Sequence, residues 1–163
     1  MTKKIPITIV LLVITCLLQL FGLSRLVIFS LTVDAVTIFL AVVSVIFGQR
    51  IGMTFGFGAG FFIGFFTGHP GLEILVRTME GFVAGYCSVP PDSHATSKQK
   101  SRKLYLAVVL AIFAGNIIFA LGINPLALPF GYRVFLLGGV EAILSLAITF
   151  VLNRFFLKKL LSE

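Results

Sequence analysis

The candidate polar contacts inside the apolar runs of this sequence are Glu73, Arg77, Glu80, Asn116 and Glu141. Spacings of four and three residues put Glu73, Arg77 and Glu80 on one face of a helix. Paired carboxyl groups are what acid–base catalysis uses. The sequence offers no nucleophile beside a base, no phosphate-binding loop, and no His or Cys cluster at metal-ligand spacing. We therefore predict that the protein is not an enzyme and holds no metal or cofactor.

The elements that position these groups are predicted to be membrane helices. Of the 163 residues, 58% are apolar and only 12% are charged, whereas about a quarter are charged in soluble domains. Each crossing of a bilayer needs about 20 helical residues, so the chain has room for six. We predict an all-α, polytopic integral membrane protein with one transmembrane domain over residues 1–163. The predicted spans are about 5–23, 34–47, 51–68, 71–89, 104–122 and 132–152, with a cytoplasmic loop at 90–103. Cys16 and Cys87 are predicted to be free, buried thiols.

The basic residues indicate the direction of the chain through the membrane. Six crossings put ten bases on the side of the termini: Lys3, Lys4, Arg50, Lys98, Lys100, Arg102, Lys103, Arg154, Lys158 and Lys159. Only Arg25 and Arg133 fall on the other side. Because cytoplasmic loops are enriched in Lys and Arg, both termini are predicted to be cytoplasmic. The same bias explains the net charge of +7 through contacts with anionic lipid headgroups, and no nucleic-acid partner is predicted.

Charged groups inside a span need partners, because each costs roughly 2.5–3.5 kcal/mol to insert. Arg77 and Glu141 are expected at similar depths, so we predict that Arg77 contacts either Glu141 or Glu80. Three roles are open for these groups: a structural clamp, a polar surface for another membrane protein, and a path for a proton or substrate. Asp34 is expected in the first turn of the second span, where an acid complements the helix dipole. Asn116 is expected to form an interhelical hydrogen bond.

Glycine recurs at every fourth position from 48 to 68. Small residues let helices approach closely in lipid, and a step of four drifts about 40° around a helix. We therefore predict that the third span is buried at the centre of the bundle and passes more than one neighbour; a self-association seam is the alternative. The predicted packing glycines in this span and the next are Gly52, Gly56, Gly60, Gly64, Gly68, Gly81 and Gly85.

The stretch from Asp34 to Gly85 resembles the rod-shape-determining membrane protein MreD. Members of this family tend to have an aspartate at the second span, then Gly-Phe with glycines at four-residue steps, a Gly-Leu turn, and Thr, Gly-aromatic and Ala-Gly pairs. The matching residues here are Asp34, Gly56-Phe57, Gly60, Gly71-Leu72, Leu75, Arg77-Thr78, Gly81-Phe82 and Ala84-Gly85. The sequence departs from the family at Gly64 and Val33, where an aspartate and a proline are common.

The resemblance implies a non-enzymatic scaffold subunit of the bacterial cell-elongation complex, located in the inner membrane. Such a subunit binds MreC and, with MreB filaments and a RodA-type wall synthase with its transpeptidase, supports lateral peptidoglycan synthesis.

A second family is also similar: the substrate-binding component of an energy-coupling-factor vitamin transporter, whose partner is an ATPase coupling module. The Phe-Gly opening of the third span and Glu80-Gly81 resemble that family. Its first helix usually offers alanines four residues apart to the coupling protein, whereas residues 5–24 contain no alanine. We therefore prefer the scaffold hypothesis and keep the vitamin-binding component as the alternative.

Overall fold

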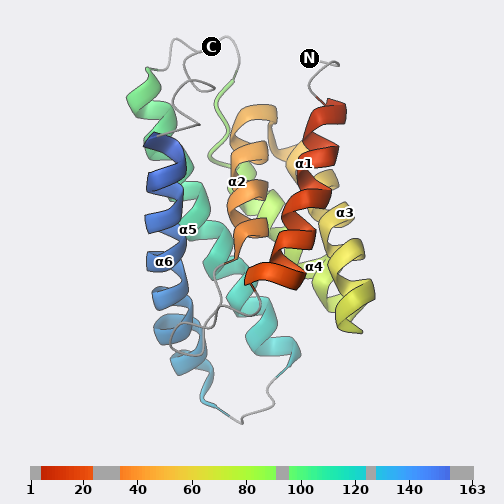
Figure 1. Ribbon diagram of the computed structural model, residues 1–163. Coiled ribbons are helices and arrows are strands. Elements are labelled where there is room, and N and C mark those ends of the chain that lie inside the picture. The colour runs from red at the N-terminus through yellow and green to blue at the C-terminus, as the bar shows by residue number, and fades with distance from the viewer. Residues whose placement is uncertain (1–4, 24–33, 91–95, 124–127, 155–163) are drawn as a thin grey trace.

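The computed structural model describes residues 5–23, 34–90, 96–123 and 128–154, and within these ranges the regular elements are all helices. Figure 1 shows them packed as a bundle. Two short π-helical segments extend the first and last helices. The elements are α1 (Ile5–Leu17), η2 (Leu18–Gly22), α2 (Ala35–Phe47), α3 (Gln49–Thr67), α4 (Pro70–Gly85), α5 (Ser97–Gly122), η4 (Tyr132–Leu137) and α6 (Gly138–Leu152).

Four of the predicted spans are long and apolar enough to cross a membrane. They are Ile5–Gly22, Gln49–Thr67, Ser97–Gly122 and Tyr132–Leu152. The other two helices are shorter, because α2 has 13 residues and α4 has 16. At 1.5 Å per residue these two helices reach about 20 and 24 Å, less than the bilayer core of about 30 Å.

The polar loop predicted at 90–103 is shorter than expected, because α5 already begins at Ser97. The Thr96 hydroxyl accepts from Gln99 N–H while the Gln99 side chain accepts from Thr96 N–H. This reciprocal capping satisfies two backbone donors that a helix start leaves unpaired. Hydropathy alone did not detect this start, since the first turns of α5 are rich in Lys and Arg.

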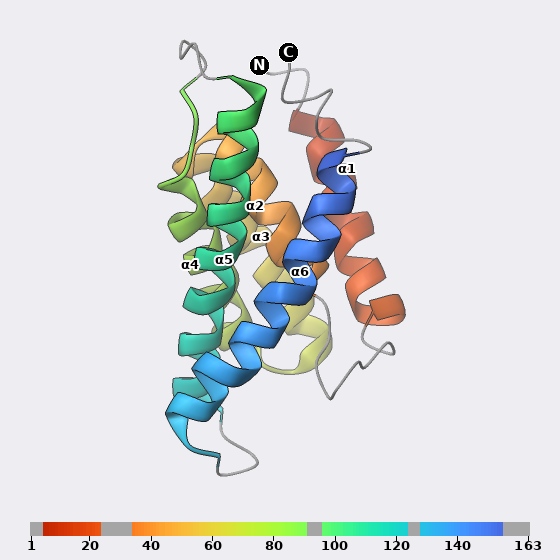
Figure 2. The same ribbon diagram turned by 90° about the vertical axis from the view of Figure 1, so that its left-hand side faces the viewer.

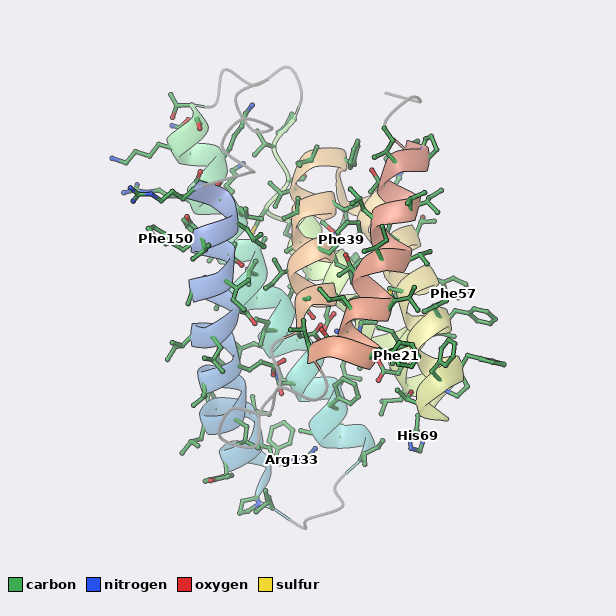
Figure 3. All side chains as sticks on the ribbon, in the orientation of Figure 1. Phe21, Phe39, Phe57, His69, Arg133 and Phe150 are labelled. Carbon is green, nitrogen blue, oxygen red and sulfur yellow. The ribbon has the colours of Figure 1, made fainter. Side chains whose placement is uncertain are left out.

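The ends of the bundle separate the charges as predicted. The beginnings of α1 and α5 and the end of α6 lie together at the upper end in Figure 1. The described basic residues of α5, and Arg154 after α6, belong to this end. Arg133 lies at the lower end (Figure 3), where it donates to the carbonyls of Ala120 and Phe119 in the last turn of α5. The bases at positions 3, 4, 25, 158 and 159 lie outside the described residues.

The central helix of the bundle is α2, and the prediction that the third span is central was wrong. One side of α2 joins a core with α4, α5 and α6, and its other side joins a core with α1 and α3. Helix α3 lies at the edge of the bundle (Figure 1), and Phe65 on its outer side is 78% exposed. Helix α3 does pass more than one neighbour, as predicted, because it contacts α4, α2 and α1. It is not central because its outer side carries exposed phenylalanine side chains.

Helices α3 and α4 form an antiparallel hairpin with a tight turn. Gly68 ends α3 in the left-handed conformation, with φ of 79°, which glycine adopts without steric cost. His69 follows, and Pro70 occupies the first position of α4, where the missing proline N–H leaves no bond unmade. The turn predicted at His69-Pro70 is confirmed. Gly68 therefore serves the turn and not the helix contact, since a side chain there would meet open space.

The other predicted glycines of this hairpin pack as expected. Glycines four residues apart along α3 face positions about four residues apart along α4, in the reverse order because the helices are antiparallel. A Cβ on Gly60 would lie 2.5 Å from the carbonyl oxygen of Glu73, and one on Gly64 would lie 2.5 Å from Pro70 Cα. A Cβ on Gly56 would meet the backbone of Arg77, and one on Gly52 would meet Ser44 of α2 as well as Gly81. On the α4 side, Gly81 faces Gly52 and Gly85 faces Gln49.

Candidate functional site: a buried polar layer

Arg77 is the centre of the polar residues inside the bundle. It lies in the middle of α4 and is only 5% exposed. Its Nη1 atom is 3.1 Å from Glu80 Oε2, and its Nε atom is 3.4 Å from Glu73 Oε2. The Glu73 pair is an ion pair by distance but lacks hydrogen-bond geometry. The three charges predicted to share one face of this helix therefore interact, and the Arg77–Glu80 contact is confirmed.

Helix α2 supplies the second half of the layer through Asp34 and Thr37. Asp34 caps α2, and its Oδ1 atom accepts from Val36 N–H at 3.0 Å and Thr37 N–H at 3.1 Å. Its Oδ2 atom forms an ion pair with Arg77. The Thr37 hydroxyl lies 2.9 Å from Arg77 Nη1 and 2.9 Å from Glu80 Oε2. Two positions on α2 thus tie this helix to two side chains of α4.

Sequence reasoning placed Asp34 correctly at the start of its helix but missed its ion pair with Arg77. The depth estimate compared only Arg77 and Glu141 and did not consider Asp34. In the fold, the start of α2 lies beside Arg77, seven residues into α4 from Pro70, which is about 10 Å along a helix. A signal was present, because a buried arginine needs acids and Asp34 was the one acid within the predicted spans left without an assigned partner.

Glu141 does not form the predicted contact with Arg77. It accepts instead from Asn116 Nδ2 at 2.7 Å, and the same amide donates to the Ile112 carbonyl at 3.0 Å. Helix α5 packs against both α4 and α6 and lies between them in Figure 2. A similar expected depth in the membrane does not say which helices are neighbours. The interhelical hydrogen bond predicted for Asn116 is confirmed.

Glycines of α5 and α6 make room for these polar groups. A Cβ on Gly115 would collide with Glu80 Oε1, and one on Gly138 would lie 3.4 Å from the Asn116 side chain. Their role was not predicted, because only the regular glycine repeat of the third span and the Gly81 and Gly85 positions were singled out. An isolated glycine next to a polar residue on a neighbouring helix gives no periodic signal.

The remaining residues of the resemblance divide into packed and exposed positions. Leu72 contacts Gly122, where a Cβ would lie 2.6 Å from Leu72 Cδ1. Thr78 lies against Gly56, and the Phe82 ring meets Tyr86 edge-on with ring centres 5.2 Å apart. Phe57 differs from these residues, because it is 54% exposed and points away from the bundle in Figure 3.

The charged side chains of this layer form a buried network of ion pairs centred on Arg77. Breaking a buried ion pair by removing one partner costs about 3–5 kcal/mol, because the other charge is left uncompensated. The Asp34–Arg77 ion pair and the hydrogen bonds of the Thr37 hydroxyl join α2 to α4. Within the described ranges, no group of three or more His, Cys, Asp or Glu side chains is arranged to hold a metal ion. Cys16 and Cys87 are free and buried, as predicted.

The fold and this layer define the class: an all-helical protein with four helices long and apolar enough to cross a membrane, and with a charged layer buried between its helices. No family model, curated protein or solved structure matches the chain.

Proposed function

We propose that this chain is an MreD-like scaffold subunit of the bacterial cell-elongation complex, located in the inner membrane, whose work is to bind MreC and support lateral peptidoglycan synthesis. Contacts with MreB filaments and with the RodA-type wall synthase and its transpeptidase belong to the same proposal. The chain crosses the membrane six times with both termini in the cytoplasm.

One observation supports this proposal above the others. Several residues of the resemblance, which is spread over about 50 positions, pack together in one part of the bundle. Asp34 at the start of α2 pairs with Arg77 of α4, and Gly56 and Gly60 pack on the α4 backbone around the same arginine. These residues pack against one another on α2, α3 and α4. A family that has the same residues at these positions is therefore expected to pack these three helices in the same way.

The outer face of α3 is the surface that we assign to a partner helix. Phe57, Phe61 and Phe65 recur at four-residue steps and are 54%, 59% and 78% exposed. The glycine contacts with α4 lie on another face of α3, so more than half of each ring remains uncovered in the described bundle. A row of large side chains at this spacing suits the groove of one more helix, such as the single span of MreC.

Six crossings agree with the lengths of α2 and α4 when the bundle is considered as a whole. Both helices are shorter than the bilayer core, but α2 is enclosed by its neighbours and α4 is covered by α3 and α5. A short helix surrounded by protein meets little lipid, so the mismatch has a modest cost. The basic residues at the end of the bundle that carries the start of α1 favour a cytoplasmic location for that end.

The test is recovery of MreC with the full-length chain from bacterial membranes in mild detergent. We expect MreC to be recovered with the wild-type chain, and recovery to fall several-fold when Phe57 and Phe61 are both replaced by alanine. The matched control is Phe150→Ala, since Phe150 is 55% exposed on α6, on another side of the bundle in Figure 3. Recovery of an ATPase coupling module with a bound vitamin, in place of MreC, would refute the scaffold proposal and support the alternative.

A further inference from the structure

A polar contact joins the start of α5 to the end of α6. Asn153 of α6 is buried, and its Nδ2 atom donates to Tyr105 Oη at 2.8 Å and to Ser101 Oγ at 3.1 Å. These two hydrogen bonds place Ser101 and Tyr105 on the side of α5 that faces α6. Because they fix how the two helices meet, they also fix where the neighbouring basic residues lie.

Three basic residues next to this contact lie on one side of the α5–α6 pair. Lys98 and Arg102 lie about 60° and 100° around α5 from Ser101. Arg154 lies about 100° around α6 from Asn153. The two helices run in opposite directions (Figures 1 and 2). A forward rotation on each helix therefore leads to the same side of the pair, so the three bases share one surface.

The positive charges of this surface are not balanced within the described part of the chain. Lys98, Arg102 and Arg154 are exposed and form no ion pair with a described acid. The acids of the described ranges all belong to the buried polar layer. The Tyr105 oxygen accepts from Asn153, and its own hydrogen has no acceptor among the described residues. Three cations and one O–H group are therefore available to an anion.

Next to these bases, the same side of the pair becomes apolar. Leu106 follows Arg102 by four residues and is 54% exposed, and Phe150 precedes Arg154 by four residues and is 55% exposed. Figure 3 shows Phe150 on the outer side of α6. Four residues span about 6 Å of helix, and both helices are long and apolar enough to cross a membrane. A molecule that covers this surface needs an anionic head and hydrocarbon chains.

We propose that this side of the α5–α6 pair binds one anionic glycerophospholipid by its phosphodiester headgroup. Arg102 and Arg154 donate to the phosphate oxygens, since a guanidinium can form two parallel hydrogen bonds with phosphate, and Tyr105 donates its O–H. The acyl chains lie along Leu106 and Phe150. A headgroup that also carries an amine would find no described carboxylate to bind it, so an uncharged group beyond the phosphate is favoured. Basic pockets between membrane helices bind phospholipid headgroups in this way.

Such a site differs from the general attraction between a basic surface and an anionic membrane. That attraction is roughly equal for every Lys or Arg near the membrane surface. Arg50 at the start of α3 and Lys103 lie at the same end of the bundle but not on this surface. The Lys103 Nζ atom donates to the Ser88 carbonyl after α4, about 100° around α5 from Arg102. Replacing Arg50 and Lys103 therefore removes the same charge without touching the proposed site.

The experiment titrates the purified full-length chain in mild detergent with phosphatidylglycerol and counts the bound lipids by native mass spectrometry. We expect the first phosphatidylglycerol to bind about tenfold more tightly than phosphatidylcholine with the same acyl chains, because charge-assisted hydrogen bonds are strong. The double variant Arg102→Gln, Arg154→Gln should weaken this first binding about tenfold, and Tyr105→Phe should weaken it several-fold. The matched double variant Arg50→Gln, Lys103→Gln should bind the first lipid like the wild type.

Four outcomes would overturn the proposal. An equal loss of affinity in the two double variants would reduce the binding to general charge attraction. Equal affinity for phosphatidylcholine and phosphatidylglycerol would leave these bases to an acidic protein segment. Competition by millimolar glycerol phosphate, which has a phosphate but no acyl chains, would assign the site to free phosphate. Wild-type affinity in Tyr105→Phe would exclude a headgroup bound beside the contact between α5 and α6.

Discussion

Replacing Gly60 with alanine should separate α3 from α4. The added Cβ would lie 2.5 Å from both the Glu73 carbonyl oxygen and Ile74 Cα. Both neighbours are backbone atoms of a helix, which cannot rotate away as a side chain would. Ordinary contact begins at 3.4 Å, so the backbones must move apart locally by about 0.9 Å, and such overpacking is destabilising.

The expected cost of this substitution is about 1–3 kcal/mol, the range for overpacking a well-packed interior. Separation of the helices also weakens the neighbouring glycine contacts. It displaces the backbone of Glu73, which lies one helical turn before Arg77. An alanine is otherwise favoured over glycine within a helix by roughly 0.5–1 kcal/mol. A loss of stability in Gly60→Ala would therefore be opposite to the gain that helix propensity predicts. The bulkier Gly60→Leu substitution should disrupt accumulation in the membrane or partner binding.

Gly58 provides a matched control on the same helix. A Cβ there would meet only Leu12 Cδ2, at 3.9 Å, which is ordinary contact. Thermal unfolding of both alanine variants in the same detergent should show Gly58→Ala at or above wild-type stability and Gly60→Ala below it. Equal stability of the two variants would refute the close contact between α3 and α4.

Three further predictions address the ion pair, the helix start and the orientation. Replacing Asp34 with alanine should cost about 3–5 kcal/mol of unfolding free energy, because it leaves Arg77 buried with less compensation; a loss below 1 kcal/mol in chemical denaturation would contradict that pairing. Thr96→Ala should cost about 1 kcal/mol through loss of the cap on α5, whereas Thr96→Ser should be neutral by the same measurement. In intact cells, a membrane-impermeant thiol reagent should label a cysteine at Tyr132 but not one at Ser97. The reverse labelling pattern would invert the proposed orientation.

The buried polar layer contains side chains from four helices, α2, α4, α5 and α6, and these side chains differ in burial. Glu80 and Arg77 are deeply buried, whereas Glu141 and Asn116 are half-buried. Helix α2 is central because it contacts both cores and also contributes Asp34 and Thr37 to this layer. A perturbation of the layer should therefore affect the whole bundle more than a loss of one surface contact would.

Several features followed from the amino-acid sequence through local rules. Apolar runs of sufficient length indicated the helices, His69-Pro70 indicated the turn between α3 and α4, and the spacing of Glu73, Arg77 and Glu80 predicted a common helix face. These features depend on residues close together in the chain, for which a helix has fixed rise and rotation. The glycine contacts were predicted for the same reason, since a four-residue repeat keeps small residues near one side of a helix.

The arrangement of neighbours was decided only in the tertiary structure. Sequence reasoning placed α3 at the centre and paired Arg77 with either Glu80 or Glu141, whereas the fold places α2 at the centre and adds Asp34 to the arginine. Every helix here is apolar over most of its surface, so burial inside the bundle and exposure to lipid have the same composition. Hydropathy indicates where a helix runs but not which of its faces meets another helix. That choice depends on the shapes and charges of residues far apart in the chain.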